Sequence, residues 1–363
     1  MKSKEILVVG GGIFGATAAL SLAKRGHKIT LLESGVIPEP QASSTDISKL
    51  IRADYGDDHF YTNLMTDAFD GWRKWNSNFH RTLFHEVGAL LLTKEEMKPG
   101  EFEWESYQCL NAQDYRLRRL KDGLQESEFR AWNNQAYLDG YYNPTAGWAE
   151  SGEVTTEVLR LSKEAGVDVR ESEGCLELLK ENVRVFGVRT TQGRDLYADE
   201  IILCAGAWNL KILPELCELL KVVGQPVIYF RPTEPSAFEP PHFVPWAADI
   251  ARTGWYGFPV NKEGILKIAN HGPGYKIDLS KPLPQVESAT IEAARDFLRS
   301  SIPEAAEFPV VDTRVCLYCD SSDGDFLISR HPYLTGLTVA TAGSGHAFKF
   351  APLLGELTAN AVD

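Results

Sequence analysis

ILVVGGGIFG, residues Ile6–Gly15, is an apolar strand pattern that runs directly into a glycine turn. The next residues, Ala16–Arg25, have the composition and spacing of a helix. A second apolar stretch, Thr30–Leu32, ends in the acid Glu33. Strand, glycine turn, helix, strand and acid therefore follow one another in the order of a βαβ unit that binds a dinucleotide.

Each glycine of the turn has its own predicted role. Gly10 permits the tight turn, Gly12 lets the backbone approach a pyrophosphate, and Gly15 lets the helix pack closely on the strand. The pyrophosphate then meets free N–H groups at the helix start, where Ile13–Phe14 lie. Glu33 can accept hydrogen bonds from ribose hydroxyls. This motif alone does not distinguish FAD from NAD.

Length and composition describe a globular protein with room for two domains. The chain has 363 residues, of which 44% are hydrophobic and 24% are charged. Its formal net charge of −13 argues against a nucleic-acid partner, because a phosphate backbone needs a basic surface. The sequence has no secretory signal and no stretch apolar enough to span a membrane. We therefore expect a soluble monomer or weak homo-oligomer.

The cysteine content favours a reducing compartment. Six cysteines in a chain of this length do not form the pattern of a disulfide framework. We therefore expect a cytoplasmic or peroxisomal protein with free thiols. The chain ends within a predicted helix, so we expect further residues after Asp363, and a peroxisomal tail cannot be read from this end.

Patterns along the rest of the chain predict two interleaved domains in an α/β plus α+β fold. Helices are expected at about Phe60–Phe79, Gly152–Glu164 and Phe348–Val362, and strands at His85–Thr93, Asp168–Thr190 and Leu337–Ala342. Residues Pro99–Tyr142 look irregular, and Val222–Asp312 looks like a separate antiparallel sheet. This order predicts a dinucleotide domain of residues 1–85, 146–221 and 317–363. A substrate domain with an antiparallel sheet then comprises residues 86–145 and 222–316.

A further apolar strand ends in small residues. Ile201–Cys204 is followed by Ala205, Gly206, Ala207 and Trp208. Small residues at the end of a parallel strand permit a cofactor to approach closely. A plain strand-to-helix turn is the alternative.

Several blocks together resemble one family. The blocks are the N-terminal motif, Ser43–Gly56, Leu203–Trp208, Trp255–Gly274, Arg314–Pro332 and Thr341–Gly355. Their order is similar to that in the FAD-dependent amine oxidases of the monomeric sarcosine oxidase group, which includes pipecolate, saccharopine and fructosyl amino acid oxidases. The resemblance implies that the dinucleotide is FAD, and it places Ser44 and Lys49 at the cofactor. Lys49 stands where sarcosine oxidase has an arginine.

The resemblance implies a covalent flavin. Cys316 matches a family cysteine that forms a thioether with the flavin ring, two residues before Tyr318. Taken without the resemblance, Cys316 and Cys319 could be a metal or redox pair, or buried inert thiols. A single CxxC without a second pair or nearby histidines argues against zinc, so we expect no metal site.

The resemblance also assigns the residues that carry the chemistry. Lys267 matches a lysine over the flavin where oxygen reacts, because a fixed cation stabilises the charge that forms on oxygen. The alternative is that Lys267 lies on the solvent-exposed face of a strand, as most lysines do. His271 matches a substrate-pocket histidine of sarcosine oxidase, where fructosyl amino acid oxidases carry an acid; it could also simply precede the turn Gly272–Gly274. Tyr256 and Tyr318 are expected to line the pocket.

The last block supplies backbone N–H donors and Lys349, which is expected to form a clamp with Arg52 on the substrate carboxylate. N–H groups at Gly343, Gly345 and His346 are expected to stabilise negative charge on the flavin. Lys349 matches a family lysine that binds the substrate carboxylate and also lies at the cofactor, and Arg52 matches its partner. A surface salt bridge and a helix-surface cation are the alternatives for these two residues.

The expected reaction follows from these assignments. A secondary amine in an N-substituted or cyclic amino acid, such as sarcosine, pipecolate or saccharopine, is oxidised to an imine that water hydrolyses. Oxygen is reduced to hydrogen peroxide. Alternatives are a fructosyl amino acid oxidase, a flavin amine dehydrogenase with another electron acceptor, and a dinucleotide-binding regulator without catalysis.

Overall fold

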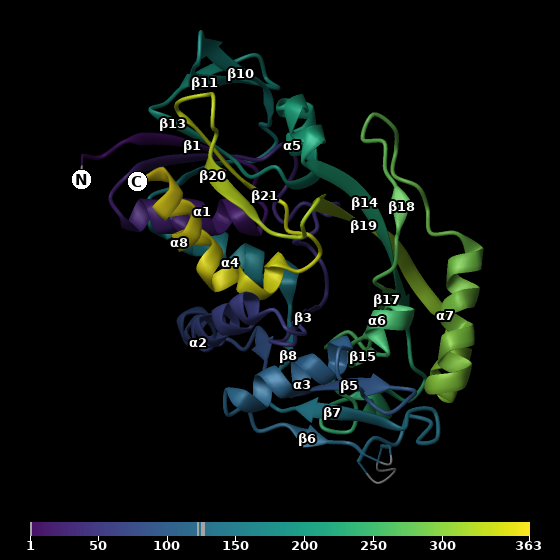
Figure 1. Ribbon diagram of the computed structural model, residues 1–363. Helices are drawn as coiled ribbons and strands as arrows, with labels where there is room; N and C mark the ends of the chain where they lie inside the picture. Colours follow the sequence, from purple (N-terminus) through teal and green to yellow (C-terminus); the bar gives the residue numbers. More distant parts are fainter. Residues whose placement is uncertain (1, 122, 125–127) are drawn as a thin grey trace.

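A six-stranded sheet carries the N-terminal βαβ unit (Figure 1). The computed structural model describes residues 2–121, 123–124 and 128–363. The strand order is β20-β21-β13-β1-β2-β9, and all neighbours are parallel except β20 and β21. The strands are β1 Glu5–Val9, β2 Lys28–Leu32, β9 Asp168–Arg170, β13 Glu200–Leu203, β20 Leu327–Arg330 and β21 Leu337–Thr341. Such near-continuous apolar strands are typical of a parallel sheet covered on both faces.

Helices cover one face of this sheet and a small sheet covers the other. Helices α1 (Ile13–Lys24), α4 (Ser151–Glu164) and α8 (Ala351–Val362) share a core with Ile6 and Val8 of β1. The alternate residues Leu7 and Val9 pack toward a three-stranded sheet, β10-β11-β12. Its strands are β10 Cys175–Glu181, β11 Arg184–Thr190 and β12 Asp195–Tyr197, and the short helix α5 (Asn209–Ile212) lies beside it.

The glycine turn is as tight as the sequence predicts. Gly10 has φ +108°, and a Cβ there would lie 2.6 Å from the carbonyl oxygen of Cys204. A Cβ on Gly15 would lie 1.9 Å from the carbonyl oxygen of Gly10. The close contact of α1 with β1 therefore depends on a residue without a side chain.

A nine-stranded sheet forms the second half of the molecule. Its order is β18-β14-β17-β16-β15-β5-β7-β6, with β19 paired to β14. The strands are β5 Ala89–Thr93, β6 Arg118–Arg119, β7 Asp139–Asn143, β14 Leu220–Phe230, β15 Trp246–Ala248, β16 Trp255–Gly257, β17 Leu266–Asn270, β18 Tyr275–Lys276 and β19 Val310–Ser321. Helix α7 (Ser288–Ser301) lies on the outside of this sheet (Figure 1) and shares a core with Phe230, Leu266 and Ile268.

Short elements connect the two halves. Strands β3 (Lys49–Ile51), β8 (Gly147–Ala149) and β4 (Phe84–His85) form a small antiparallel sheet. The remaining helices are α2 His59–Phe79, α3 Phe102–Ala112 and α6 Ile250–Thr253. The expected α/β plus α+β fold is confirmed.

Three local expectations are wrong. The strand expected at His85–Thr93 is two strands in different sheets, because Gly88 turns the chain at φ +82°. The segment Val222–Asp312 contains helix α7, whose apolar residues Ile291, Ala294, Phe297 and Leu298 have helical spacing. The last helix begins at Ala351 after a 3₁₀ turn rather than at Phe348.

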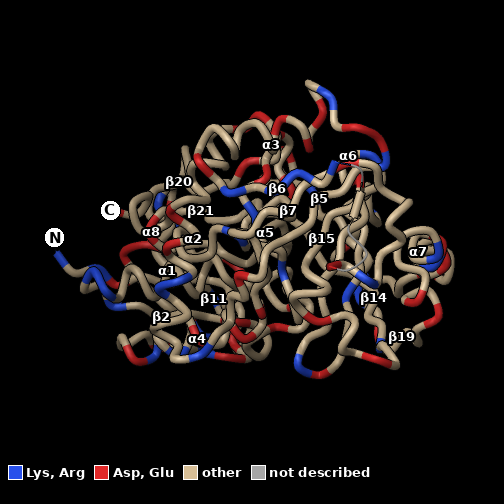
Figure 2. Tube along the Cα trace, turned by 90° about the horizontal axis from the view of Figure 1, so that it is seen from below, with Lys and Arg blue, Asp and Glu red and all other residues tan. Residues whose placement is uncertain are grey.

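Acidic and basic residues are interspersed along the chain trace (Figure 2). Across the described residues, no helix is both long and apolar enough to cross a membrane.

The variant Gly15→Ala tests the close packing of α1 on β1. We expect the free energy of unfolding to fall by about 1–3 kcal/mol, because the added methyl group overpacks the contact and forces the backbones of α1 and β1 apart. Gly152→Ala is the matched control. A Cβ on Gly152 would lie 3.5 Å from its nearest neighbour, the carbonyl oxygen of Asp46, which is an ordinary contact. Alanine also stabilises a helix by about 0.5–1 kcal/mol relative to glycine. Urea unfolding of both variants measures the difference, and equal stability would contradict the packing role.

Candidate active site

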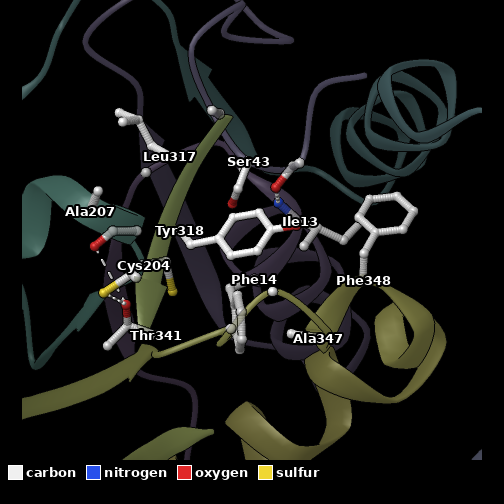
Figure 3. Close-up of a pocket in the computed structure, with 18 of the residues that line it drawn as sticks. Ile13, Phe14, Ser43, Cys204, Ala207, Leu317, Tyr318, Thr341, Ala347 and Phe348 are labelled. Atoms are coloured by element: carbon white, nitrogen blue, oxygen red, sulfur yellow. Dashed lines mark hydrogen bonds between the residues drawn. The ribbon is translucent and has the colours of Figure 1, made fainter. Parts of the chain in front are cut away.

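A cavity of about 800 Å³ is lined by residues of both large sheets. The ring of Tyr318 projects into it from β19, and its walls include Phe14 and Ala347 (Figure 3). The predicted site residues that line it are Gly10, Gly12, Ile13, Phe14, Glu33, Ser44, Lys49, Arg52, Ala205, Gly206, Trp208, Tyr256, Lys267, His271, Tyr318, Gly343, Gly345, His346 and Lys349. Gly15 and Cys316 are not among the described lining residues.

Strand register brings distant residues to one face of the nine-stranded sheet. Tyr256 of β16 is opposite Ala269 of β17, which is opposite Val227 of β14. Val227 is in turn opposite Arg314 of β19. Paired residues share a face with residues two positions away along each strand. This face therefore carries Tyr256, Lys267, Ala269, Arg314, Cys316 and Tyr318.

Lys267 is a buried cation with an anionic partner. Its Nζ donates to Asp46 Oδ2 and to the carbonyl oxygen of Ser48, each at 2.6 Å, and lies 4.7 Å from the centre of the Phe258 ring. Burial lowers the pKa of Lys267 to about 8, and Asp46 opposes this decrease. The interpretation of Lys267 as a solvated strand residue is therefore wrong, because only 2% of it is exposed.

Arg52 and Lys349 form a second group of cations. Arg52 Nη1 is buried and has no hydrogen-bond partner in the described part of the chain. Lys349 is buried in the 3₁₀ turn before α8, with its Nζ 5.1 Å from the centre of the Tyr55 ring. Burial and the charge of Arg52 hold the pKa of Lys349 well below its ordinary value. Neither residue is the surface cation that the alternative interpretations describe.

Asp54 supplies one negative charge beside these cations. It is fully buried and lines the cavity, and its Oδ1 accepts a hydrogen bond of 2.5 Å from the Tyr141 hydroxyl. Burial raises the pKa of Asp54, although Arg52 and Tyr141 favour the ionised form. With Asp54 ionised, Arg52 and Lys349 together leave one positive charge uncompensated.

His271 lies just beyond the end of β17. The strand ends at Asn270, so His271 does not continue the alternation from Lys267, although both residues line the cavity. Its backbone N–H donates to Gly254 at 2.7 Å. Desolvation in the cavity and the charges of Lys349 and Arg52 lower its pKa. The lowered pKa favours the neutral ring at neutral pH, although part of the residue is exposed.

His346 is a neutral residue with both ring nitrogens engaged. Nε2 lies 2.9 Å from the carbonyl oxygen of Gly324, which can only accept, so Nε2 carries the hydrogen. Nδ1 then accepts a hydrogen bond of 2.9 Å from the Tyr55 hydroxyl. Burial lowers the pKa of His346 to about 3. This chain of hydrogen bonds fixes the Tyr55 ring beneath Lys349.

The turn Gly343–His346 lies against the ring of Tyr318. Gly345 has φ +70°, and a Cβ there would lie 2.4 Å from that ring. The absence of a side chain lets the backbone of the turn approach the aromatic wall of the cavity.

Comparisons with known proteins place the chain in a family. Residues 5–361 match the family model described as FAD dependent oxidoreductase. The chain belongs to this family.

Two relatives and one solved structure illustrate the similarity. The chain is 24% identical to the peroxisomal sarcosine oxidase of Homo sapiens, over 97% of this chain and 90% of that protein. It is 26% identical to the L-saccharopine oxidase of Schizosaccharomyces pombe, over 99% and 90%. The crystal structure of the fructosyl amine oxidoreductase Amadoriase I from Aspergillus fumigatus superposes with a TM-score of 0.83 at 23% identity, over 99% and 86%. The resemblance to the sarcosine oxidase group is confirmed.

The residues of this FAD-dependent oxidoreductase fit the cofactor at the glycine turn. Gly12 and Ser44 line the cavity together, and Ser44 Oγ accepts the N–H of Ile13 at 2.9 Å. The carboxylate of Glu33 accepts N–H groups of Gly11 at 2.8 Å and Gly35 at 3.1 Å. Glu33 is therefore held in place at the end of β2, where it can meet a ribose.

Cys316 lies beside the cavity rather than on its wall. Only 2% of it is exposed, and it packs with Tyr229, Ala269 and the partly buried Tyr256 and Tyr318. All the cysteines of the chain are free. The thiol is on the same sheet face as Lys267, and its neighbours Tyr256 and Tyr318 line the cavity.

The sequence did not reveal the partners of the predicted residues. Asp46, Asp54 and Tyr55 stand in quoted blocks, but no pattern indicates that they contact Lys267, Arg52 and His346. Phe258 and Tyr141 were also missed. The contacts join residues far apart in sequence, and only the aligned homologues of a family could have indicated them.

The variant Tyr55→Phe tests the hydrogen bond to His346. We expect a loss of about 1–3 kcal/mol in the free energy of unfolding, because Nδ1 of a buried neutral histidine loses its donor. Tyr333→Phe is the control, since Tyr333 is 80% exposed. Urea unfolding near pH 7 measures both variants, and equal stability would contradict the assigned tautomer of His346.

Proposed function

We propose that the protein oxidises the secondary amine of an N-substituted or cyclic amino acid and passes the electrons to oxygen. The observation that carries this proposal is the pair of cations at the cavity: Lys349 is buried, and the half-buried Arg52 has a buried Nη1 without a hydrogen-bond partner in the described chain. A buried cation is unfavourable without an anionic partner, and a carboxylate matches the planar guanidinium. The names of the two relatives, a sarcosine oxidase and a saccharopine oxidase, support the same substrate class.

The charge of the clamp fits a single carboxylate. Arg52 and Lys349 contribute two positive charges, and Asp54 contributes one negative charge behind them. A bound monocarboxylate completes the balance and restores the favourable environment of the Lys349 ammonium. Arg52 then fixes the orientation of the carboxylate, which places the rest of the substrate against the walls of the cavity.

The remaining walls suit a neutral amine. His271, Tyr256 and Tyr318 line the cavity without a formal charge at neutral pH. An uncharged wall favours the neutral amine over the ammonium, which is the form with a free electron pair. FAD, when bound, supplies the acceptor for two electrons and a hydrogen. The chain itself binds and orients the substrate, and Lys267 provides a fixed cation for oxygen.

A substrate panel tests this function. Purified protein is mixed without oxygen with sarcosine, pipecolate, saccharopine or fructosyl lysine, and the flavin absorbance is followed. We expect bleaching with at least one secondary-amine amino acid and peroxide after air is admitted. Bleaching without peroxide would indicate a dehydrogenase, and no bleaching with any amine would contradict the proposed enzyme class.

The variants Arg52→Gln and Lys349→Met test the clamp. We expect each to raise KM for the active amino acid by about 30-fold or more, because loss of one partner from a buried charge pair costs about 2–5 kcal/mol. Lys180→Met, on the exposed strand β10, is the control. An unchanged KM in both clamp variants would place the substrate carboxylate elsewhere.

The covalent flavin linkage through Cys316 is part of the same proposal. The protein is precipitated with acid, and the pellet and supernatant are inspected for yellow colour. We expect the colour in the pellet for the unmodified protein and for Cys319→Ala, but in the supernatant for Cys316→Ala. Cys319 is the matched control because it is buried in the same strand, has the opposite alternation from Cys316, and itself lines the cavity. Yellow supernatant from the unmodified protein would contradict a covalent link.

A further inference from the structure

Asp46 stands at the centre of a buried network around Lys267. Its Oδ2 accepts the 2.6 Å hydrogen bond from Lys267 and lies 3.6 Å from Lys49 Nζ. Its Oδ1 accepts from the Tyr229 hydroxyl at 2.9 Å and from the N–H of Ile47 at 2.8 Å. The side chain of Asp46 has no exposed surface. One carboxylate is thus bonded to donors from two strands of the sheet and from its own loop.

The backbone of Asp46 ties this loop to the other half of the molecule. Its carbonyl oxygen accepts from Ser151 Oγ and from the N–H of Gly152, each at 3.0 Å, at the start of α4. Arg314 of β19 donates to the carbonyl oxygens of Thr45 and Ala42. The position of the carboxylate is therefore fixed from several directions.

The hydrogen bonds of Lys267 leave one donor for the cavity. An ammonium has three N–H groups. Two are taken by Asp46 and Ser48, so the third is the one available where Lys267 lines the cavity. The direction of this third N–H is set by the two bonds that the loop provides.

We propose that Asp46 is a positioning residue that keeps Lys267 protonated and directs its remaining N–H into the cavity, toward the place where oxygen is reduced. This inference rests on the proposed use of oxygen as electron acceptor. In that step two electrons leave the reduced cofactor and, with two protons, convert oxygen to hydrogen peroxide. A nearby fixed positive charge stabilises the anionic oxygen species that forms first.

The sign of the expected effect follows from the charges that face Lys267. Burial and the charge of Lys49 disfavour the ammonium, while Asp46 and Cys316 favour it; Arg314 acts on Asp46, and Tyr229 lies on the same sheet face. Removal of the Asp46 charge lowers the pKa of Lys267 further. Lys267 then loses its proton at a lower pH. Reoxidation by oxygen therefore begins to slow at a lower pH than in the unmodified protein.

The experiment separates oxygen reactivity from substrate oxidation. The flavin of the purified holoenzyme is reduced by light without oxygen and then mixed with oxygenated buffer between pH 6 and pH 9. We expect Asp46→Asn to slow reoxidation at least 10-fold at pH 8 and to shift its pH profile to lower pH. Lys267→Met should be slow and without this pH dependence. Because no amine is present, failure of the proposed substrate class leaves this result interpretable.

A matched control separates the effect of the Asp46 carboxylate from that of the hydrogen bonds that hold the Asp46 backbone. Ser151→Ala removes a hydrogen bond to the Asp46 carbonyl but leaves the carboxylate in place. We expect this variant to melt at a lower temperature and to keep the pH profile of the unmodified protein. If Ser151→Ala shifts the profile as much as Asp46→Asn, the effect comes from the loop and the proposal is overturned.

Thermal unfolding gives a readout that does not depend on catalysis. The melting temperatures of Asp46→Asn, Lys267→Met and the double variant are compared with that of the unmodified holoenzyme. Because each single change leaves one buried charge alone, we expect the double variant to lose less than the sum of the single losses. Additive losses together with unchanged reoxidation would overturn the proposal.

Discussion

Burial of positive charge is the constraint on which this structure depends. Lys267 and Lys349 are buried beside one cavity and Arg52 is half-buried there, where an ammonium or guanidinium is unfavourable unless an opposite charge is near. Among the described residues, two carboxylates meet this demand: Asp46 beside Lys267, and Asp54 beside Arg52 and Lys349. The loop before β3 takes its shape around the first of these, and β7 supports the second through Tyr141.

The two large sheets divide the work between backbone and side chains. At the six-stranded sheet the turn between β1 and α1 needs residues without side chains, and its chemistry is that of N–H groups at a helix start. At the nine-stranded sheet, register places aromatic rings, a thiol and a lysine on the face toward the cavity. The opposite face of the same strands is apolar and packs against α7. Strand alternation therefore separates the face toward the cavity from the apolar core.

Local patterns revealed those parts of the molecule whose causes are local. The glycine turn, the apolar strands and helices α1, α2 and α4 each depend on residues within a few positions of one another, and the sequence predicted them. The helical spacing of Ile291, Ala294 and Phe297 in α7 was missed, because the whole segment Val222–Asp312 was interpreted as an antiparallel sheet. Gly88 divided a predicted strand, because its positive φ interrupts the extended backbone between β4 and β5.

The candidate site could be predicted only as a set of separate residues. Resemblance to a family identified Arg52, Lys267, His271 and Lys349, and the structure places them around one cavity. The resemblance could not identify Asp46 as the partner of Lys267, because the two residues are far apart in the sequence and meet only in the folded protein. A buried acid looks in sequence like any polar loop residue. The role of Asp46 becomes visible only from the buried ammonium of Lys267 beside it.

The two groups of cations differ in a way that separates their roles. Lys267 has its charge matched by Asp46 and two of its donors occupied, so it needs no ligand to be stable in the protein. Arg52 keeps an unpartnered donor within the described chain, and Lys349 has its pKa held well below the ordinary value. An anionic ligand therefore gains most at Arg52 and Lys349 and little at Lys267. In the proposed reaction, an amino acid can therefore bind at Arg52 and Lys349 without neutralising the cation proposed to act on oxygen, Lys267.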